Sequence, residues 1–198
     1  MSGMQALEHF FVKQKITVMA NRYEIRAANA DGSEGPVIAV AQQKRFAFKE
    51  QVTFYASDDK RVAVFGFKAR TRIDLGATYD VTDGDGNPIG WFRKQFGASM
   101  LRSTWDVGAA DGTQATGRER SQNIAIARRV WEFLPVVSEL PSPFVFHFDF
   151  VDGSGQVLMS SVRKRSLRDR YEVTVPGGRL DGRVAAAMAV ALDALQSR

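Results

Sequence analysis

Three polar residues in the middle of the chain have the spacing of a cation site. Asp83, Asp85 and Asn87 stand two residues apart, as the first three ligands of a calcium-binding loop do. Such a loop also needs glycine at its sixth position and glutamate at its twelfth, where this chain has Pro88 and Lys94. We therefore interpret the stretch as a tight turn and expect no metal or other cofactor.

A histidine and an aspartate in residues 144–150, FVFHFDF, could act as a general base and the group that orients it. His147 and Asp149 are two residues apart, so on a strand they share one face and the phenylalanines share the other. We expect the phenylalanine face to point into the core and the polar face to point to water. The chain also lacks the nucleophile-elbow, zinc-protease and phosphate-loop motifs, so we expect that it is not an enzyme.

Basic residues recur at a fixed place in a repeated unit. Five times, an aromatic-led strand is followed by a turn rich in Asp and Gly, a second strand, and then Lys or Arg. If successive hairpins run up and down, the turns gather at one end of the sheet and the basic residues at the other. The candidate site for an anionic headgroup is Lys44, Arg45, Lys68, Arg93, Lys94, Arg163, Lys164 and Arg165.

Phenylalanines accompany these basic residues, as in residues 45–48, RFAF, and at Phe67 and Phe96. Basic and aromatic side chains together could dock on an anionic lipid surface. They could also hold nucleic-acid phosphates while the rings stack on bases, although we do not favour nucleic acid as the partner. In a third interpretation they bind no ligand, because the charges solvate the strand ends and the phenylalanines belong to the core.

The turns predict the fold class. Asp-Gly pairs between short β-rich runs are typical of hairpins, since glycine adopts the positive φ angles that tight turns need. Five hairpins in sequence make about ten to twelve antiparallel strands. A sheet of that size usually closes, because closure removes exposed edges. We expect a mainly β protein, a closed antiparallel barrel of about twelve strands.

One stretch near the end must be enclosed by that barrel. Residues 184–192, VAAAMAVAL, contain no polar side chain, so a helix here is apolar around its whole circumference. Its apolar length of about 14 Å is too short for a membrane span. Asp181 is the predicted N-cap of this helix, and it follows the strand breaker PGG at 176–178. We expect a core helix from about Asp181 to Leu195 and no transmembrane segment.

Residues 121–134 depart from the hairpin pattern. Apolar residues there recur at helical spacing, and Pro135 ends the pattern. We expect one additional helix near 121–134, on the outside of the barrel or closing one end, and a strand in its first half is the alternative. The proline-rich residues 135–143 are interpreted as a loop inside a single domain that spans residues 1–198.

Composition sets outer limits on the function. The chain has 198 residues, of which 44% are hydrophobic and 25% charged, as is typical of globular domains. It contains no cysteine, which excludes disulfides and thiol chemistry. The formal charge of +5 and the pI near 9.7 fit an acidic partner without choosing one. Residues 1–15 have no apolar core typical of a signal peptide, so we expect a cytoplasmic protein.

The order of these features resembles a known family. The opening VKQKIT at 12–17, the repeated strand-turn-strand units, and the ending YEVTVPGGRLDGR at 171–183 before an apolar helix are similar to the LURP-one-related family. That family belongs with the tubby C-terminal domain and the phospholipid scramblases. The resemblance covers essentially the whole chain and implies a twelve-stranded barrel around a hydrophobic C-terminal helix.

The resemblance implies less about activity. Tubby-like domains bind phosphoinositides through basic residues, scramblases are linked to calcium-dependent lipid movement, and LURP-one-like members have no settled activity. We expect a non-catalytic binding or tethering module, cytoplasmic or peripheral at the inner membrane face, that contacts anionic phospholipid or phosphoinositide headgroups through a basic rim. The alternative is a protein-interaction or structural module with an acidic protein partner. A nucleic-acid-binding protein and a scramblase-like lipid mover are less favoured.

Overall fold

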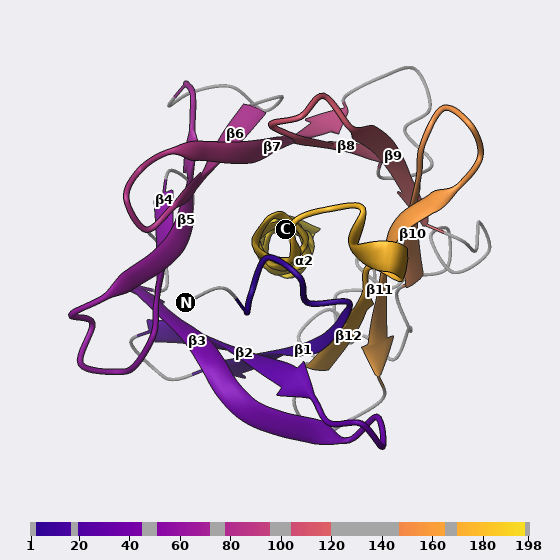
Figure 1. Ribbon diagram of the computed structural model, residues 1–198. Coiled ribbons are helices and arrows are strands. Elements are labelled where there is room, and N and C mark those ends of the chain that lie inside the picture. Colours follow the sequence, from indigo (N-terminus) through magenta and orange to yellow (C-terminus); the bar gives the residue numbers. More distant parts are fainter. Residues whose placement is uncertain are drawn as a thin grey trace, which may run out of the picture.

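The computed structural model of the protein describes residues 3–16, 20–44, 51–71, 78–95, 104–119, 147–164 and 170–196. In these residues twelve antiparallel strands close into a barrel with a helix inside it (Figure 1). The strands are β1 (His9–Ile16), β2 (Ala20–Ala28), β3 (Glu34–Lys44), β4 (Gln51–Tyr55), β5 (Ala63–Ala69), β6 (Thr78–Asp83), β7 (Pro88–Gln95), β8 (Thr104–Ala109), β9 (Gln114–Glu119), β10 (His147–Val151), β11 (Val157–Lys164) and β12 (Arg170–Thr174). A 3-10 helix, η1 (Pro176–Gly178), leads into the helix α2 (Gly182–Gln196). The predicted mainly β class and the barrel around a C-terminal helix are confirmed.

The strands follow one another up and down. Each strand pairs with its neighbours in sequence, and β1 pairs with β12 to close the barrel. This order is the one on which the sequence argument about the two ends of the barrel depends. The additional helix predicted near 121–134 and the loop predicted at 135–143 lie outside the described residues.

Four of the five hairpin turns that the structure describes share one hydrogen-bond pattern. In the β6–β7 turn, the amide of Asp83 donates to the carbonyl of Asn87 (2.9 Å), and the amide of Gly86 donates to the carbonyl of Asp83 (3.1 Å). Three residues lie between the bonded pair in each of these turns, and the third of them always has a positive φ, between 77° and 92°. These residues are Gly32, Gly86, Gly112 and Gly155. Glycine adopts this conformation without steric cost. In the β4–β5 turn a non-glycine residue, Lys60, has φ of 56°.

The turn aspartates also bond within their own turns. Oδ1 of Asp83 accepts the amides of Asp85 (3.0 Å) and Asn87 (2.8 Å), and Asn87 Nδ2 donates to Asp83 Oδ2 (3.0 Å). The hydrogen bonds from Asn87 hold the pKa of the Asp83 carboxyl below its usual value. The tight turn predicted at this position is confirmed, and its carboxylate already serves the turn.

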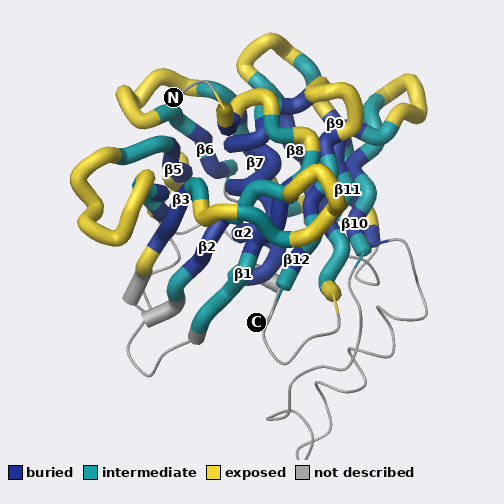
Figure 2. The backbone as a smooth tube through the Cα atoms, turned by 60° about the horizontal axis from the view of Figure 1, so that its bottom comes forward, coloured by how far each residue is buried: buried dark blue, intermediate teal, exposed yellow. Residues whose placement is uncertain are grey.

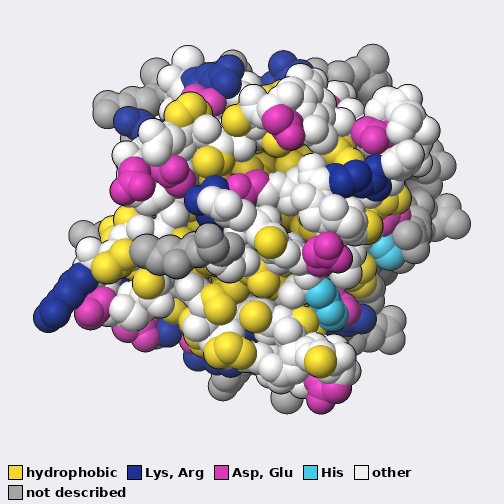
Figure 3. All heavy atoms as spheres, viewed as in Figure 1, with side chains coloured by type: hydrophobic (Ala, Val, Ile, Leu, Met, Phe, Trp, Pro, Cys, Tyr) yellow, Lys and Arg dark blue, Asp and Glu magenta, His cyan; other side chains and the backbone are white. Residues whose placement is uncertain are grey.

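The up-and-down order gives the barrel two different ends. The turns at 29–33, 56–62, 84–87, 110–113 and 152–156 lie together at what we call the turn end, where Figure 2 shows exposed loops. Figure 3 looks onto this end and shows Asp and Glu side chains around it, among Lys and Arg side chains. The chain passes this end again at η1, and α2 starts there and runs toward the opposite end.

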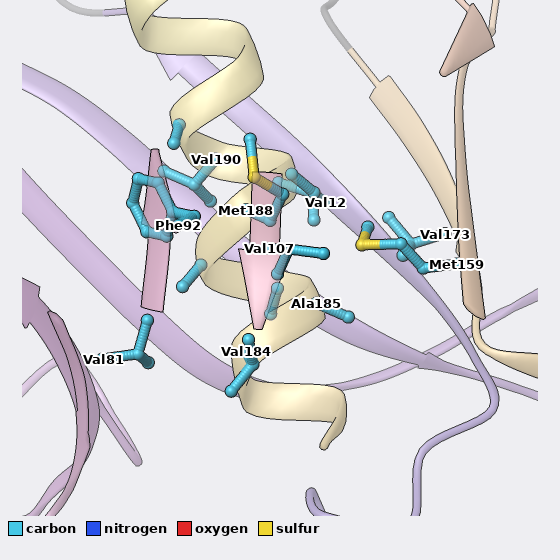
Figure 4. Close-up of a cluster of buried hydrophobic side chains, with 14 of the residues drawn as sticks. Val12, Val81, Phe92, Val107, Met159, Val173, Val184, Ala185, Met188 and Val190 are labelled. Carbon is cyan, nitrogen blue, oxygen red and sulfur yellow. The ribbon is translucent and has the colours of Figure 1, made fainter. Parts of the chain in front are cut away.

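The core lies between α2 and the inward faces of the strands (Figure 4). Residues 184–191 of α2 are all fully buried, as expected for a helix enclosed on every side. Alternate residues of each strand pack against them, such as Val12, Phe92 and Val107. Burying a side chain of this size contributes about 1.5–3 kcal/mol, so this cluster is the main source of stability. The five alanines of residues 184–191 keep this part of the helix narrow enough for the barrel.

The start of α2 is fixed by its cap and by the N-terminal segment. Oδ1 of Asp181 accepts the amide of Arg183 (2.8 Å), which confirms the predicted N-cap. The amide of Gly182 donates to the carbonyl of Gln5 (3.0 Å), and a Cβ at position 182 would lie 2.3 Å from the carbonyl oxygen of Met4. Glycine is required here because the N-terminal segment crosses so close to the helix. Among the described residues, no helix is both long and apolar enough to cross a membrane.

Candidate functional site at the basic end of the barrel

The predicted basic residues that the structure describes lie near the ends of β3, β5, β7 and β11, opposite the turn end. We call this the basic end, defined by Lys44, Lys68, Arg93, Lys94, Arg163 and Lys164. Arg45 and Arg165, which were also predicted to belong to the site, lie outside the described residues. The gathering of basic strand ends at one end of the barrel follows directly from the up-and-down order.

These side chains divide between two surfaces. Lys94 pairs in register with Trp105, and Arg163 pairs with Tyr171, whose side chains are both buried inside the barrel. Directly paired residues of antiparallel strands point to the same face, so Lys94 and Arg163 face the barrel interior. Lys94 Nζ lies 5.7 Å from the ring centroid of Trp105.

Lys68, Arg93 and Lys164 point outward, because they alternate with inward residues on their strands. Arg93 Nη2 donates to Asp106 Oδ2 (2.9 Å) on β8, and Lys164 Nζ lies 2.6 Å from Glu172 Oε2 on β12. Both basic side chains are about half exposed, at 49% and 47%. Lys68 is exposed and forms no ion pair or hydrogen bond with the described part of the chain. It is therefore the outward cation of the set that is most available to a ligand.

The pKa values of the two carboxylates that pair with these cations, Glu172 and Asp106, are lowered. The hydrogen bond from Lys164 lowers the pKa of Glu172, burial opposes the change, and a hydrogen bond with His9 reinforces it. At Asp106, burial raises the pKa, but hydrogen bonds from Gln95, Arg93 and Thr116 outweigh it and leave the pKa below its usual value. Both carboxylates are thus ionised at neutral pH and neutralise part of the charge at the basic end.

The phenylalanine that the structure describes beside these basic residues, Phe67, does not lie at the surface. Phe67 is only 1% exposed and makes edge-to-face contacts with Phe92 and Tyr79 inside the barrel. This phenylalanine belongs to the core, as the interpretation without a ligand proposed. Phe96 and the phenylalanines of residues 45–48 lie outside the described residues.

The interior of the barrel at the basic end holds a polar contact between helix and wall. Tyr23 and Tyr171 both donate hydroxyl hydrogen bonds to the carboxylate of Asp193 on α2, at 3.0 and 2.6 Å. Gln14 Nε2 donates to the hydroxyl oxygen of Tyr23 (3.0 Å). Asp193 is 8% exposed, so these bonds satisfy a carboxylate that would otherwise be costly to bury. They attach the end of α2 to β2 and β12.

The His147–Asp149 pair lies on the outer wall of β10, and Phe148 and Phe150 are in the core, as predicted. His147 Nε2 is 3.1 Å from Asp149 Oδ1, and the hydroxyl of Ser160 donates to the same oxygen (2.5 Å). Because the serine bonds to the aspartate and not to the histidine, these three residues lack the nucleophile-to-base contact of a catalytic triad. The described ranges also contain no cluster of three or more His, Asp or Glu side chains placed to hold a metal ion.

A groove of about 670 Å³ crosses the outer wall over β7–β10. Sequence reasoning did not find it. It is lined by Trp91, Arg93, Asp106, Gln114, Ala115, Thr116, Arg118, Glu119, Asp149, Val151, Asp152 and Gly153. These residues come from β7, β8, β9, β10 and the first residues of the β10–β11 turn.

Arg118 is a basic residue that the candidate set omitted. It is the penultimate residue of β9, the place that Lys68 holds in β5. Like Lys68 it is exposed and has no hydrogen bond or ion pair with the described residues. The signal was present in the repeat, because the fourth hairpin also ends in arginine.

The fold defines a class of protein, a closed antiparallel barrel with its own C-terminal helix inside it. A family model described as LURP-one-related matches residues 37–193. The chain belongs to the LURP-one-related family, which is part of the tubby-like and scramblase superfamily. A search of curated proteins gives no match. A porin-like protein from Bacteroides uniformis is similar over 86% of this chain and 96% of its own, with 9% identity and a TM-score of 0.22, which is too low to carry an argument.

Proposed function

We propose that this protein is a non-catalytic binding module whose basic end contacts anionic phospholipid headgroups, phosphoinositides included, at a membrane surface. The family and the barrel are consistent with a lipid-binding tubby-like module. The contact is electrostatic and involves no covalent chemistry. In the cell the protein would act peripherally, at the cytoplasmic face of a membrane.

The observation that carries the proposal is the separation of charge along the barrel axis. Aspartates crowd the turn end, at Asp31, Asp58, Asp59, Asp83, Asp85, Asp111 and Asp152. Basic strand ends crowd the other. An anionic surface attracts the basic end and repels the turn end, so the field of the membrane would orient the barrel with its axis across the surface.

Lys68, which is exposed and has no ion pair or hydrogen bond with the described residues, is the first contact that we propose. Lys164 is half exposed beyond its pair with Glu172, so it can also approach a headgroup. The inward-facing Lys94 and Arg163 would contact a headgroup only at the mouth of the barrel. Each Lys or Arg near an anionic surface contributes about 1 kcal/mol.

Co-sedimentation with vesicles tests the proposal. The protein is mixed with neutral vesicles, with vesicles that contain phosphatidylserine, and with vesicles that contain phosphoinositide. We expect binding that requires acidic lipid and that falls as salt is raised. The double variant Lys68→Gln with Lys164→Gln should bind about 10- to 30-fold more weakly, the equivalent of roughly 2 kcal/mol.

The matched control removes the same charge at the opposite end. Lys60 and Arg61 are exposed residues of the β4–β5 turn, so changing both to Gln lowers the net charge equally but leaves the basic end unchanged. This variant should bind vesicles as the wild type does. Equal losses in both variants would mean that only net charge matters. Absence of binding to every acidic vesicle would eliminate the lipid proposal and leave an acidic protein as the partner to test.

A further inference from the structure

The groove over β7–β10 has the chemistry of a second site, which shares Arg93 with the basic end but contains neither Lys68 nor Lys164. Its volume of about 670 Å³ falls within the range of pockets that hold small molecules. It combines one aromatic platform with several hydrogen-bonding groups from four strands. This combination decides which ligand it fits.

The platform is Trp91. A Cβ at position 108 of the neighbouring strand would lie 2.5 Å from Trp91 Nε1, so glycine at this position makes room for the indole to lie against the wall. The guanidinium of Arg93 is 5.9 Å from the indole centroid and helps to hold it. The indole is partly exposed and lines the groove, so it offers a flat apolar surface beside polar neighbours.

Two carboxylates of the groove, Asp106 and Asp149, are held in place by their neighbours. Asp106 accepts hydrogen bonds from Arg93, Gln95 and Thr116 at 2.7–3.0 Å. Asp149 accepts from Ser160 as described above. Side chains fixed in this way lose little entropy when a ligand binds, which is a property of preformed sites.

The balance of charge argues against an anionic ligand. Two guanidinium groups, Arg93 and Arg118, stand beside four carboxylates, Asp106, Glu119, Asp149 and Asp152. An anion would meet at least as much repulsion as attraction here. A neutral ligand that both donates and accepts hydrogen bonds would find partners of each kind, including the Gln114 amide and the Arg118 guanidinium.

We propose that this groove binds a neutral saccharide. A pyranose ring presents an apolar C–H face, which can pack on the Trp91 indole, and a perimeter of hydroxyl groups, each of which donates and accepts. These hydroxyls would donate to Thr116 and accept from Gln114 and Arg118. The groove has room for one or two sugar rings.

Titration followed by ¹H–¹⁵N NMR tests the proposal, with a panel of neutral mono- and disaccharides: glucose, galactose, N-acetylglucosamine, maltose, cellobiose and lactose. Glucuronic acid and inositol hexakisphosphate serve as acidic comparators. We expect at least one neutral sugar to shift the Trp91 indole N–H and the Gln114 side-chain amide in a saturable way. Trp91→Ala should weaken binding at least 10-fold, and Gln114→Ala, which removes only an exposed amide, should weaken it severalfold.

The headgroup variant separates this proposal from the preceding one. Lys68→Gln with Lys164→Gln should leave sugar binding unchanged, and Trp91→Ala should leave vesicle binding unchanged. The absence of any saturable shift across the neutral panel would overturn the saccharide proposal. So would a response to the acidic comparators alone, or full binding by folded Trp91→Ala and Gln114→Ala variants.

Discussion

At the turn end, aspartate carboxylates accept hydrogen bonds from the amides of their own turns, as Asp83 does from Asp85 and Asn87. At the basic end, the cations lie on strands and meet carboxylates of neighbouring strands, as Arg93 meets Asp106. The aspartate charges at the turn end are therefore held by backbone amides of the same hairpin. Charge at the basic end depends on how the strands are aligned.

This difference between the two ends determines which charged side chains are available to a ligand and which already serve the structure. A turn aspartate already has its partners within four residues, so a ligand would have to compete with the turn itself. A basic residue near the end of a strand can exchange its partner for a ligand at small cost, since exposed ion pairs contribute about 0–1 kcal/mol. Lys68 and Arg118 have nothing to exchange within the described residues. This contrast is why the proposed membrane contact belongs to the basic end.

The helix that connects the two ends gives the largest predicted effect. Ala189 is fully buried in the middle of α2, and Ala194 is only partly buried near the basic end. Ala189→Arg should prevent folding, because an unpaired buried charge costs about 5 kcal/mol or more, comparable with the whole stability of a domain. Ala194→Arg should cost much less, because its long side chain can reach water at the basic end. Circular dichroism and urea unfolding measure both.

Folding of Ala189→Arg with the thermal stability of the wild type would contradict the enclosure of α2. Equal damage from the two substitutions would contradict a different point, namely that the basic end is open enough for a charged side chain to leave the barrel.

Sequence reasoning succeeded where the structure is determined locally. The Asp-Gly turns and the run from Val184 to Leu192 each have their signal within ten residues or so, and the barrel follows from closing many hairpins. It failed where side chains from different strands meet. The inward direction of Lys94 and Arg163 and the Arg93–Asp106 pair all depend on strand register, since a shift of one residue moves every side chain to the other face. The groove could not be predicted for the same reason.

Substitution of Glu24 tests how much a buried carboxylate on the outer wall of the barrel contributes to stability through its ion pairs. Its carboxylate is 3% exposed and lies within 2.6–3.2 Å of nitrogen atoms of Lys15, Arg22 and Arg26. Burial raises the pKa of Glu24, but the hydrogen bonds and charges of Lys15 and Arg26 outweigh it and lower the pKa from 4.5 to about 2. We expect Glu24→Gln to destabilise the protein by about 2–4 kcal/mol at neutral pH.

The same substitution has a predicted pH dependence. Because the pKa is lower in the folded state, the contribution of Glu24 is complete above the unfolded pKa and is lost as pH falls through about 4 toward 2. The difference in unfolding free energy between wild type and Glu24→Gln should therefore shrink over that range. Asp58→Asn removes an exposed partner of Arg22 and serves as control, with an expected cost below about 1 kcal/mol. A constant difference from pH 7 to pH 2 would contradict the assignment.

Glu24→Gln also sharpens the contrast between the ends. It removes the carboxylate that Lys15, Arg22 and Arg26 share, while Arg22 stays paired with Asp58. If held cations are unavailable to lipid, the variant should bind acidic vesicles more tightly than the wild type, by severalfold. Unchanged binding would mean that these three cations lie outside the membrane contact.

The smallest effect is expected at the turn end, in the one described hairpin that lacks the shared glycine. Lys60 has φ of 56°, a conformation that costs a residue with a Cβ about 1 kcal/mol. Lys60→Gly should therefore stabilise the protein by up to about 1 kcal/mol, reduced by the greater entropy of glycine in the unfolded chain. Lys60→Ala removes the same charge but keeps the Cβ, so it should give no such gain. Urea unfolding of the two variants side by side separates backbone strain from charge, and equal stabilities would show that the β4–β5 turn gains nothing from the glycine that the other four turns use.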